Sequence, residues 1–379
     1  MAEPDSSVAV VPVESRAQRN DFLRLPLGLH AADPAYVPPL LMERSEALDE
    51  RKNPYFRHAE VGFFLALRDG RPVGRISAQV NRVHLAKYAD ATGHFGLIEG
   101  EDEAVFRALT ATAESWLGAR GMRRVLGPFN LSINEETGLL VDGFATPPMV
   151  MMGHAPVSYG RFLEAAGYRK AKDLLAYAHD FDQPIPEAAR RFIGRFGGRV
   201  AVRPLRRYRA EVAEALELYN AAWAGNWNSL PLGPEERAHL ASSMRPLIDP
   251  ALVQFADVDG RLAAFVVALP NLNAAIADLG GRLLPLGWLK LLWRLKIKGV
   301  TTARVLLMGV RPDLAGTPIG AAVAFLVIDA LRRAALAKGY ARAELSWILE
   351  DNMPMRRIIE AVGGRVYKTY RVYEKSLAP

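Results

Sequence analysis

The sequence predicts an α/β (α+β) protein made of two similar halves, each a mixed twisted sheet flanked by helices. Each half contains two apolar strand patterns joined by an Asp-Gly turn, at Asp69-Gly70 and at Asp259-Gly260, which is a strong hairpin signal. After each hairpin the patterns follow the same order of strand, helix, strand, short helix and strand. A chain of 379 residues is also too long for one typical core and suits two domains.

The first half begins with a lead-in over residues 1–45, in which the prolines between 33 and 39 favour extended backbone. Its hairpin covers residues 60–80. A helix over 103–120 ends at Gly121, a residue type that commonly terminates helices. The remaining patterns predict strands at 95–99, 123–127 and 172–180, and a helix at 159–166.

The second half repeats this order. Its patterns predict a hairpin at 253–269, strands at 304–310, 341–347 and 367–374, and helices at 319–338 and 356–362. The run Leu163-Glu-Ala-Ala-Gly-Tyr168 is similar to Ile359-Glu-Ala-Val-Gly-Gly364, which indicates weak internal repetition at the scale of a domain. We therefore expect an N-terminal domain over 1–185 and a C-terminal domain over 186–379.

The composition limits the chemistry. The chain has no cysteine, which excludes disulfides, zinc–thiolate sites, iron–sulfur clusters and a cysteine nucleophile. Acids stand near the N-terminus where a secretory signal needs bases, and no apolar run is long enough to span a bilayer. The net charge of +7 favours an anionic coenzyme, membrane or nucleic acid as a partner, although an arginine-rich surface alone gives the same balance.

The strand at 304–310 leads into a turn with Gly316 and Gly320 and then into an apolar helix. The first amide groups of a helix are unpaired donors with a partial positive charge, so they bind phosphates. The two glycines remove side chains where a pyrophosphate has to approach the backbone. A second strand and Asn352 follow.

This order, with Ala315-Gly-Thr-Pro-Ile-Gly320 on the loop and Asn352 before a short helix, resembles the acetyl-coenzyme A binding core of the GNAT acyltransferase superfamily. Three positions differ from the family pattern: Ala315 replaces a basic or amide residue, Ile359 replaces the tyrosine that protonates the leaving thiolate, and Gly364 replaces an aromatic residue. The resemblance implies that acyl-CoA is a co-substrate bound by Met308, Val310, Ala315, Gly316, Thr317, Ile319, Gly320, Ala321 and Asn352.

The corresponding loop of the first half is Glu99-Gly-Glu-Asp-Glu103. Its four acids would repel a pyrophosphate. We therefore expect the first half to have a degenerate coenzyme loop and to complete the acceptor cleft, while the second half binds acyl-CoA.

Acyl transfer to an amine needs a base for the amine and an acid for the leaving thiolate. Glu135 and Glu136 lie in a polar turn after the apolar strand 123–127, and we expect one of them to be the base; a solvated turn is the alternative. Histidine is a common proton acceptor in enzymes, so His154 could assist, although a packed core histidine is the alternative. The full set of candidate catalytic residues is Glu135, Glu136, His154, Tyr159 and Tyr373, with no metal.

The segment 282–298 is apolar and basic, and no acid occurs between Asp278 and Asp313. On a helix, one face would carry Lys290, Arg294 and Lys298, and another would carry Trp288, Leu291, Leu292 and Leu295. A basic amphipathic helix with tryptophan on its apolar side is typical of a segment lying in a membrane interface. The alternative is an ordinary amphipathic helix packed on its own domain.

The lead-in, the run Gly127-Pro-Phe-Asn-Leu-Ser-Ile-Asn-Glu-Glu136 and the Asn- and Trp-rich loop 220–232 make the whole chain similar to a bacterial tandem-GNAT group linked to sphingolipid synthesis. That group includes bacterial ceramide synthases. The resemblance implies an acyl-CoA N-acyltransferase acting on a lipidic amine such as a sphingoid long-chain base. We expect it in the cytoplasm, at the inner membrane face, with no nucleic acid partner. The alternatives are an aminoacyl-tRNA-dependent transferase that builds peptidoglycan cross-bridges, and a non-enzymatic module that binds CoA or lipid.

Overall fold

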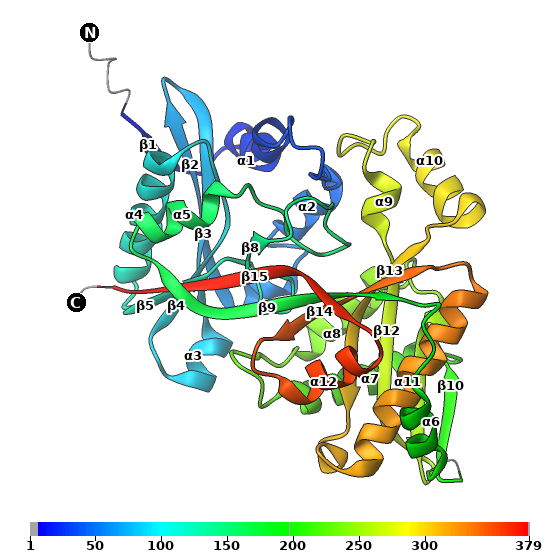
Figure 1. Ribbon diagram of the computed structural model, residues 1–379. Helices are drawn as coiled ribbons and strands as arrows, with labels where there is room; N and C mark the ends of the chain where they lie inside the picture. The colour runs from blue at the N-terminus through cyan, green and yellow to red at the C-terminus, as the bar shows by residue number, and fades with distance from the viewer. Residues whose placement is uncertain (1–6, 197, 378–379) are drawn as a thin grey trace. The chain divides into compact units, whose positions relative to one another are not determined.

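The structure of the chain is a computed structural model, and it describes residues 7–196 and 198–377. These residues form two compact units (Figure 1). The first contains the chain up to Asp173, the segment Ile276–Trp288 and the chain from Thr369 onward; the second contains Leu174–Ala275 and Leu289–Lys368. The expected boundary near residue 185 thus differs from this division, because each unit takes segments from both halves of the sequence.

The first unit is built on a mixed sheet in the order β1-β2-β3-β4-β5, and the end of β15 then pairs antiparallel with β5 and with β8. Its strands are β1 (Ala9–Pro12), β2 (Ala59–Arg68), β3 (Arg71–Asn81), β4 (Thr92–Gly100), β5 (Arg124–Gly127), β8 (Leu139–Asp142) and β15 (Arg365–Ser376), with β6 (Phe129–Asn130) and β7 (Glu136–Thr137) forming a separate pair. Its helices are α1 (Arg16–Leu29), α2 (Leu41–Ala47), η1 (Pro54–Arg57), α3 (Arg82–Tyr88), α4 (Glu103–Gly118) and α5 (Ser158–Ala165).

Helices cover both faces of this sheet. On one face, Phe22 of α1 packs with Leu65 and Leu97 in an apolar cluster. On the other face α4 lies close to the backbone of β3, since a Cβ atom added to Gly74 would lie 2.4 Å from the Val105 side chain. Strands β4 and β5 run parallel and pair at their amino ends, Thr92–His94 with Arg124–Leu126. Both strands therefore point their carboxyl ends to the same edge, where ligands bind in many α/β sheets.

The second unit has the strand order β9-β14-β13-β12-β11-β10. Its strands are β9 (Arg169–Asp180), which begins in the first unit, β10 (Val200–Pro204), β11 (Val253–Val258), β12 (Arg261–Pro270), β13 (Thr302–Val310) and β14 (Arg342–Leu349). Its helices are α6 (Glu187–Gly194), α7 (Tyr208–Trp223), α8 (Pro234–Met244), η2 (Pro250–Leu252), α9 (Leu272–Ile276), α10 (Gly287–Trp293), η3 (Arg294–Lys298), η4 (Pro312–Leu314), α11 (Pro318–Ala337) and α12 (Met353–Ala361), of which α9 and α10 straddle the division.

Alternation along β12 divides the core of this unit into two layers. Val266 and its even-numbered neighbours pack against α11, through residues such as Val323 and Val327. Phe265 faces the opposite way and packs with Leu216 and other residues of α7. Because side chains on a strand alternate between faces, one strand supplies both layers. Strand β13 pairs in parallel with β14 over Thr302–Val305. The loop before α11 follows the carboxyl end of β13.

Most sequence-predicted elements are confirmed, including both hairpins. Asp69 and Gly70 have φ values of 52° and 76°, as a tight two-residue turn requires. For the lead-in, the sequence predicted only extended backbone near its prolines. The structure has β1, α1 and the start of α2 within these residues. A capping box of Ser15 and Gln18 begins α1 and is visible in the sequence. The predicted long helix over 282–298 is also wrong in extent: α10 covers only Gly287–Trp293 and continues as a π-helical turn to Lys298.

Candidate active site

The loop between β13 and α11 has the predicted strand–turn–helix form. Thr317 is the N-cap of α11, and its Oγ1 accepts a hydrogen bond of 3.1 Å from the amide of Gly320. Pro318 supplies no N–H. The amide groups of Gly316 and Ile319 have no acceptor among the described residues. The loop therefore presents two open N–H donors at the start of a twenty-residue helix, which is the arrangement that binds phosphate oxygens.

The two glycines of this loop have different roles. Gly316 has a φ of 74°, and a Cβ atom added there would meet nothing within 4 Å. Gly320 is needed for packing, since an added Cβ atom would lie 1.9 Å from the carbonyl oxygen of Leu314. Ala315 stands where the family pattern has a basic or amide residue, and it adds no charge. The nearby Arg311 is already paired with Asp313, at 2.6 Å.

The other residues expected at the coenzyme site lie around this loop. Met308 and Val310 are on the last part of β13, and Ile319 lies at the start of α11; all three pack against the core. The indole Nε1 of Trp223 donates to the carbonyl of Met308 at 3.1 Å. The Ala321 amide bonds to the Thr317 carbonyl. Asn352 is the N-cap of α12, and its side chain accepts from the amide of Met355 at 3.3 Å.

A buried polar network lies on β14 of the same unit. Glu344 is fully buried, and it accepts hydrogen bonds from Ser346, at 2.6 Å, and from the hydroxyl of Tyr367. Arg304, on β13, lies 3.7 Å from the same carboxylate and donates to Ser346 at 2.9 Å. A buried charge that is paired and hydrogen-bonded in this way is satisfied internally. Because alternate residues of a strand point to the same face, Glu344 and Ser346 can both join this network.

In the first unit, the expected base Glu136 is held in an ion pair. Arg44 of α2 bonds to one of its carboxylate oxygens, and Asn130 donates to the other at 2.8 Å. Burial raises the pKa of Glu136, but the charge and hydrogen bond of Arg44 outweigh it, so the pKa lies below its usual range. A carboxylate with a lowered pKa is a weaker base. Glu135 lies in the same turn, with its amide bonded to the carbonyl of Ser132.

His154 belongs to a different buried cluster. Its Nε2 lies 2.7 Å from the Oδ2 atom of Asp33, and only 2% of its side chain is exposed. The pKa of Asp33 is raised by partial burial but lowered further by the hydrogen bond and charge of His154, and the net direction is down. Next to it, the Nε2 of His30 lies 2.8 Å from Glu99, at the carboxyl end of β4. Tyr36 packs on this pair, with its ring centroid 4.6 Å from that of His30.

The two candidate tyrosines are both buried in the first unit. The hydroxyl of Tyr159 donates to Glu99 at 3.0 Å and accepts from the amide of Gly100 at 3.2 Å. Burial, followed by the charge of Glu99, raises the pKa of Tyr159. Burial likewise raises the pKa of Tyr373 to about 12. A raised pKa keeps both hydroxyls protonated at neutral pH, which an acid requires, but both are enclosed by protein.

The acidic loop of the first unit is neutralised internally. Asp102 caps α4 by accepting from the amide of Val105, and it pairs with Arg68 at 2.7 Å. Glu101 pairs with Arg71 through two hydrogen bonds of 2.6 and 2.9 Å. The side chain of Asp102 therefore occupies a helix amide that a phosphate would use. The sequence predicted repulsion by four unpaired acids, but the ion pairs weaken that repulsion.

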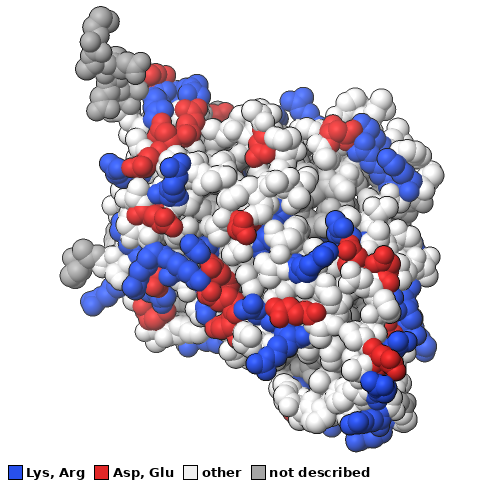
Figure 2. Space-filling view, in the orientation of Figure 1, with Lys and Arg blue, Asp and Glu red and all other residues white. Residues whose placement is uncertain are grey.

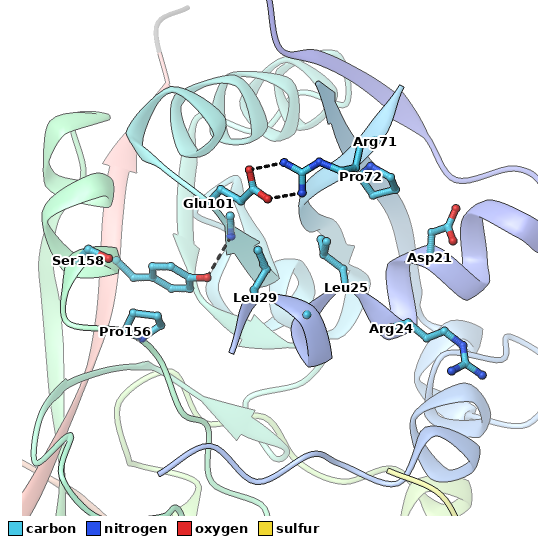
Figure 3. Close-up of a pocket in the computed structure, with 12 residues that line it drawn as sticks. Asp21, Arg24, Leu25, Leu29, Arg71, Pro72, Glu101, Pro156 and Ser158 are labelled. Atoms are coloured by element: carbon cyan, nitrogen blue, oxygen red, sulfur yellow. Dashed lines mark hydrogen bonds and ion pairs between the residues drawn. The ribbon is translucent and has the colours of Figure 1, made fainter. Parts of the chain in front are cut away.

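A pocket of about 670 Å³ opens on the first unit at this end of β4, within the size range of small-molecule sites (Figure 3). The Arg71–Glu101 pair lies on one side of it, and Pro156 and Ser158 lie on another. The remaining lining residues come mainly from α1: Asp21, Arg24, Leu25, Gly28, Leu29, Pro72, Gly100 and Tyr159. The pocket thus combines apolar walls with paired charges, and Tyr159 connects its wall to the Glu99–His30 cluster.

The segment around α10 exposes large apolar side chains. Leu284 and Ile297 are 79% and 76% exposed, and Trp288, Leu292 and Trp293 are each about half exposed. Lysine and arginine side chains gather over the α10 part of the surface (Figure 2). Arg294 differs from expectation, because its guanidinium donates to the carbonyl of Ala275 at 2.7 Å instead of lying in water. The segment therefore leaves a large part of its apolar surface exposed.

Among the residues that the structure describes, no helix is long and apolar enough to cross a membrane. Within 7–196 and 198–377 there is also no group of three or more side chains suited to hold a metal ion.

Comparison with solved structures identifies the fold. The chain is similar to a tandem GNAT protein from the clavulanic acid biosynthesis pathway, with a TM-score of 0.57, 12% identity and coverage of 98% of this chain and 99% of that one. It is also similar to a GCN5-related N-acetyltransferase from Sphaerobacter thermophilus, with a TM-score of 0.56, 16% identity and coverage of 99% and 97%. At these identities the likeness concerns the fold, and it defines the chain as a tandem GNAT-fold protein.

No family model matches the sequence. Two relatives match it over nearly their whole length. The chain is 50% identical over 378 residues to the bacterial ceramide synthase of Caulobacter vibrioides (strain NA1000 / CB15N), covering 98% of each chain. It is 41% identical over 372 residues to Protein YghO of Escherichia coli (strain K12), covering 96% of this chain and 95% of that one. The chain therefore belongs to the bacterial ceramide synthase family.

The sequence analysis did not single out Asp33, His30 or Tyr36. All three lie in the lead-in, where no motif marks them. Their only local signal is a histidine followed three residues later by an aspartate, within Leu29-His-Ala-Ala-Asp-Pro34. Only the fold brings them beside His154, which is more than 100 residues away in sequence.

Proposed function

We propose that this chain is an acyl-CoA-dependent N-acyltransferase that joins an acyl group to the amine of a sphingoid long-chain base. The main support is the 50% identity to a bacterial ceramide synthase over 98% of the chain, since a ceramide is an N-acylated sphingoid base. The open amides of Gly316 and Ile319 at the start of α11 add a site of the right chemistry for the pyrophosphate of a coenzyme A thioester. The expected coenzyme-binding residues lie on the last part of β13, on this loop and the start of α11, and at the start of α12, and we assign the coenzyme to them.

The reaction can be followed directly. Purified protein, a long-chain acyl-CoA and sphinganine should give an N-acyl product, detected by mass spectrometry, together with free CoA in equal amount. A primary alcohol of the same chain length should not replace the amine. Hydrolysis of acyl-CoA without amide formation, or binding of both ligands without turnover, would contradict the proposal and favour a binding module.

We also propose that the segment 284–297 contacts the cytoplasmic face of a membrane, where a lipidic acceptor resides. This proposal is supported by the exposed tryptophan, leucine and isoleucine side chains and by the basic residues beside them, such as Lys290. Amphipathic tryptophan rings and cationic side chains favour the headgroup region of an anionic bilayer.

A further inference from the structure

The edge of β13 that faces β14 is unpaired over its last part. The two strands pair in parallel only as far as Val305 and Leu345. Beyond that point β14 stays with β9, to which Ile348 and Leu349 pair, while β13 stays with β12 up to Val310. Strand β13 therefore approaches the loop before α11 with one edge that no neighbouring strand covers among the described residues, and we call it the open edge of β13.

The register with β12 shows which backbone groups point to this open edge. The amide of Arg311 donates to the carbonyl of Ala263 at 2.8 Å, so these two residues form a hydrogen-bonded pair. In an antiparallel ladder, such pairs alternate with pairs whose N–H and C=O groups point away from each other. Val310 and Met308 lie one and three positions before Arg311 in this register, so they belong to the second kind. Their backbone groups therefore point away from β12.

One of these groups already has a partner, which is the indole of Trp223. Its Nε1 donates to the carbonyl of Met308 at 3.1 Å, in agreement with a carbonyl that points away from β12. Trp223 is the last residue of α7 and is half-buried, and its ring packs on Tyr219 with the centroids 5.1 Å apart. By the same register, the amide of Met308 and both backbone groups of Val310 are left without a partner within 7–196 and 198–377.

The open edge is continuous with the loop to which we assign the pyrophosphate of coenzyme A. That loop follows Val310 in the chain, and its open amides are those of Gly316 and Ile319. Beyond the pyrophosphate, coenzyme A is a flexible arm with two amide groups that ends in the thiol. Each amide has a donor and an acceptor that need partners when the arm leaves water. An extended chain of this kind can pair with an unpaired strand edge through main-chain hydrogen bonds.

We infer that Trp223 competes with this arm for the carbonyl of Met308. When acyl-CoA binds, an amide N–H of the arm replaces the indole N–H at that carbonyl, and the neighbouring unpaired backbone groups serve the rest of the arm. The inference rests on the proposed function, because it takes the coenzyme to lie at the loop before α11. Competition of this kind weakens binding of the arm and favours release of free CoA after transfer.

The alternative role of Trp223 is an anchor that only fixes the end of α7 on β13. Both roles need the aromatic ring, but only competition makes the indole N–H unfavourable for coenzyme binding. Trp223→Phe keeps a ring that can pack on Tyr219 and removes the N–H, so it separates the two roles.

Binding of two ligands to the full chain tests the competition by calorimetry. CoA carries the arm, whereas 3′-phospho-ADP has the same nucleotide and pyrophosphate without it. Trp223→Phe should bind CoA about two- to tenfold more tightly, because one hydrogen bond no longer has to be broken, and should bind 3′-phospho-ADP as the wild type does. Trp116→Phe, at a half-buried position on α4 of the first unit, is the control and should change neither affinity. Equal or weaker binding of CoA by Trp223→Phe would overturn the inference.

A measurement on the wild-type protein separates this inference from the proposed function. The indole N–H signal of Trp223, assigned in NMR spectra by its loss in Trp223→Phe, should shift and exchange faster with solvent when CoA is added. Addition of 3′-phospho-ADP should leave the hydrogen bond intact. If CoA binds and the signal is unchanged, the Met308 carbonyl does not pass from the indole to the arm, and the inference is wrong while the coenzyme site stands. Absence of any CoA binding contradicts the proposed function and the inference with it.

Discussion

Single residues show where sequence patterns predict a site and where they do not. Gly316, Thr317 and Gly320 can be proposed from the sequence because a phosphate loop needs backbone donors at adjacent positions, so this requirement takes the form of a local motif. A site for the amine acceptor does not require a local motif of this kind. The side chains of Asp33 and His154, for example, are brought together only by long-range packing, and their sequence positions have no fixed spacing. Glu136 looked suitable by position, but its partner Arg44 is distant in sequence and could not be foreseen.

The different surroundings of the two loop glycines allow a sharp test of coenzyme binding. Gly316→Asp places a negative charge beside the open amides, at a φ of 74° that aspartate and asparagine tolerate better than other side chains do. We expect it to weaken CoA binding by about tenfold or more, because the charge repels the pyrophosphate. Isothermal titration calorimetry with CoA measures the effect.

Gly316→Asn is the matched control, since it has the same shape and backbone strain without the charge. It should retain most of the affinity. Gly320 is unsuitable for this purpose, because any side chain there would collide with the backbone of Leu314 and disturb the loop itself. If Gly316→Asp and Gly316→Asn bind CoA equally well, the pyrophosphate lies elsewhere.

At the scale of elements, the composition of the segment around α10 correctly predicted an apolar and basic surface, but the sequence pattern did not predict the length of the helix. The sequence pattern indicated a helix of seventeen residues, but Pro285 has no N–H and α10 begins only at Gly287. What the pattern did predict is a large apolar surface flanked by bases, and the structure leaves that surface exposed. Exposed apolar patches of this kind commonly mark interaction sites.

We expect a variant with Trp288, Leu292 and Trp293 all changed to serine to lose binding to anionic vesicles, by about tenfold or more. The reason is that each change removes apolar area that would leave water on contact with lipid. Flotation of the protein with phosphatidylglycerol vesicles measures the partition. Serine substitutions at the exposed residues Met42, Leu336 and Val366 serve as the control and should leave it unchanged. CoA binding should be the same in all three proteins; vesicle binding that survives the α10 changes would mean that this segment is not the contact.

At the scale of the whole molecule, the repeat of hairpin, helix and strand made the fold class predictable, since hydrophobic periodicity and Asp-Gly turns are local signals. The assignment of strands to units was not predictable in the same way. The C-terminal strand β15 reads as the last strand of the second half, yet from Thr369 onward it belongs to the first unit. There it pairs with β5 and β8. Strand pairing depends on contacts far apart in sequence, which a periodic pattern does not encode.

This exchange of a strand predicts that the first half of the sequence is not a self-sufficient domain. A fragment of residues 1–185 lacks Tyr370, Val372 and Tyr373, all buried in the first unit, and burying each such side chain contributes about 1.5–3 kcal/mol. It also leaves Glu114 without Lys375, which lies 2.8 Å away in the intact chain.

Appending residues 365–377 to this fragment through a flexible Gly/Ser linker should restore the strand. We expect a cooperative thermal transition, at least about 5 °C above that of the bare fragment, when unfolding is followed by circular dichroism. The same graft carrying Tyr370→Asp and Val372→Asp is the control and should give no gain. A bare fragment that already unfolds cooperatively at the temperature of the grafted one would show that the first unit does not need the C-terminal strand.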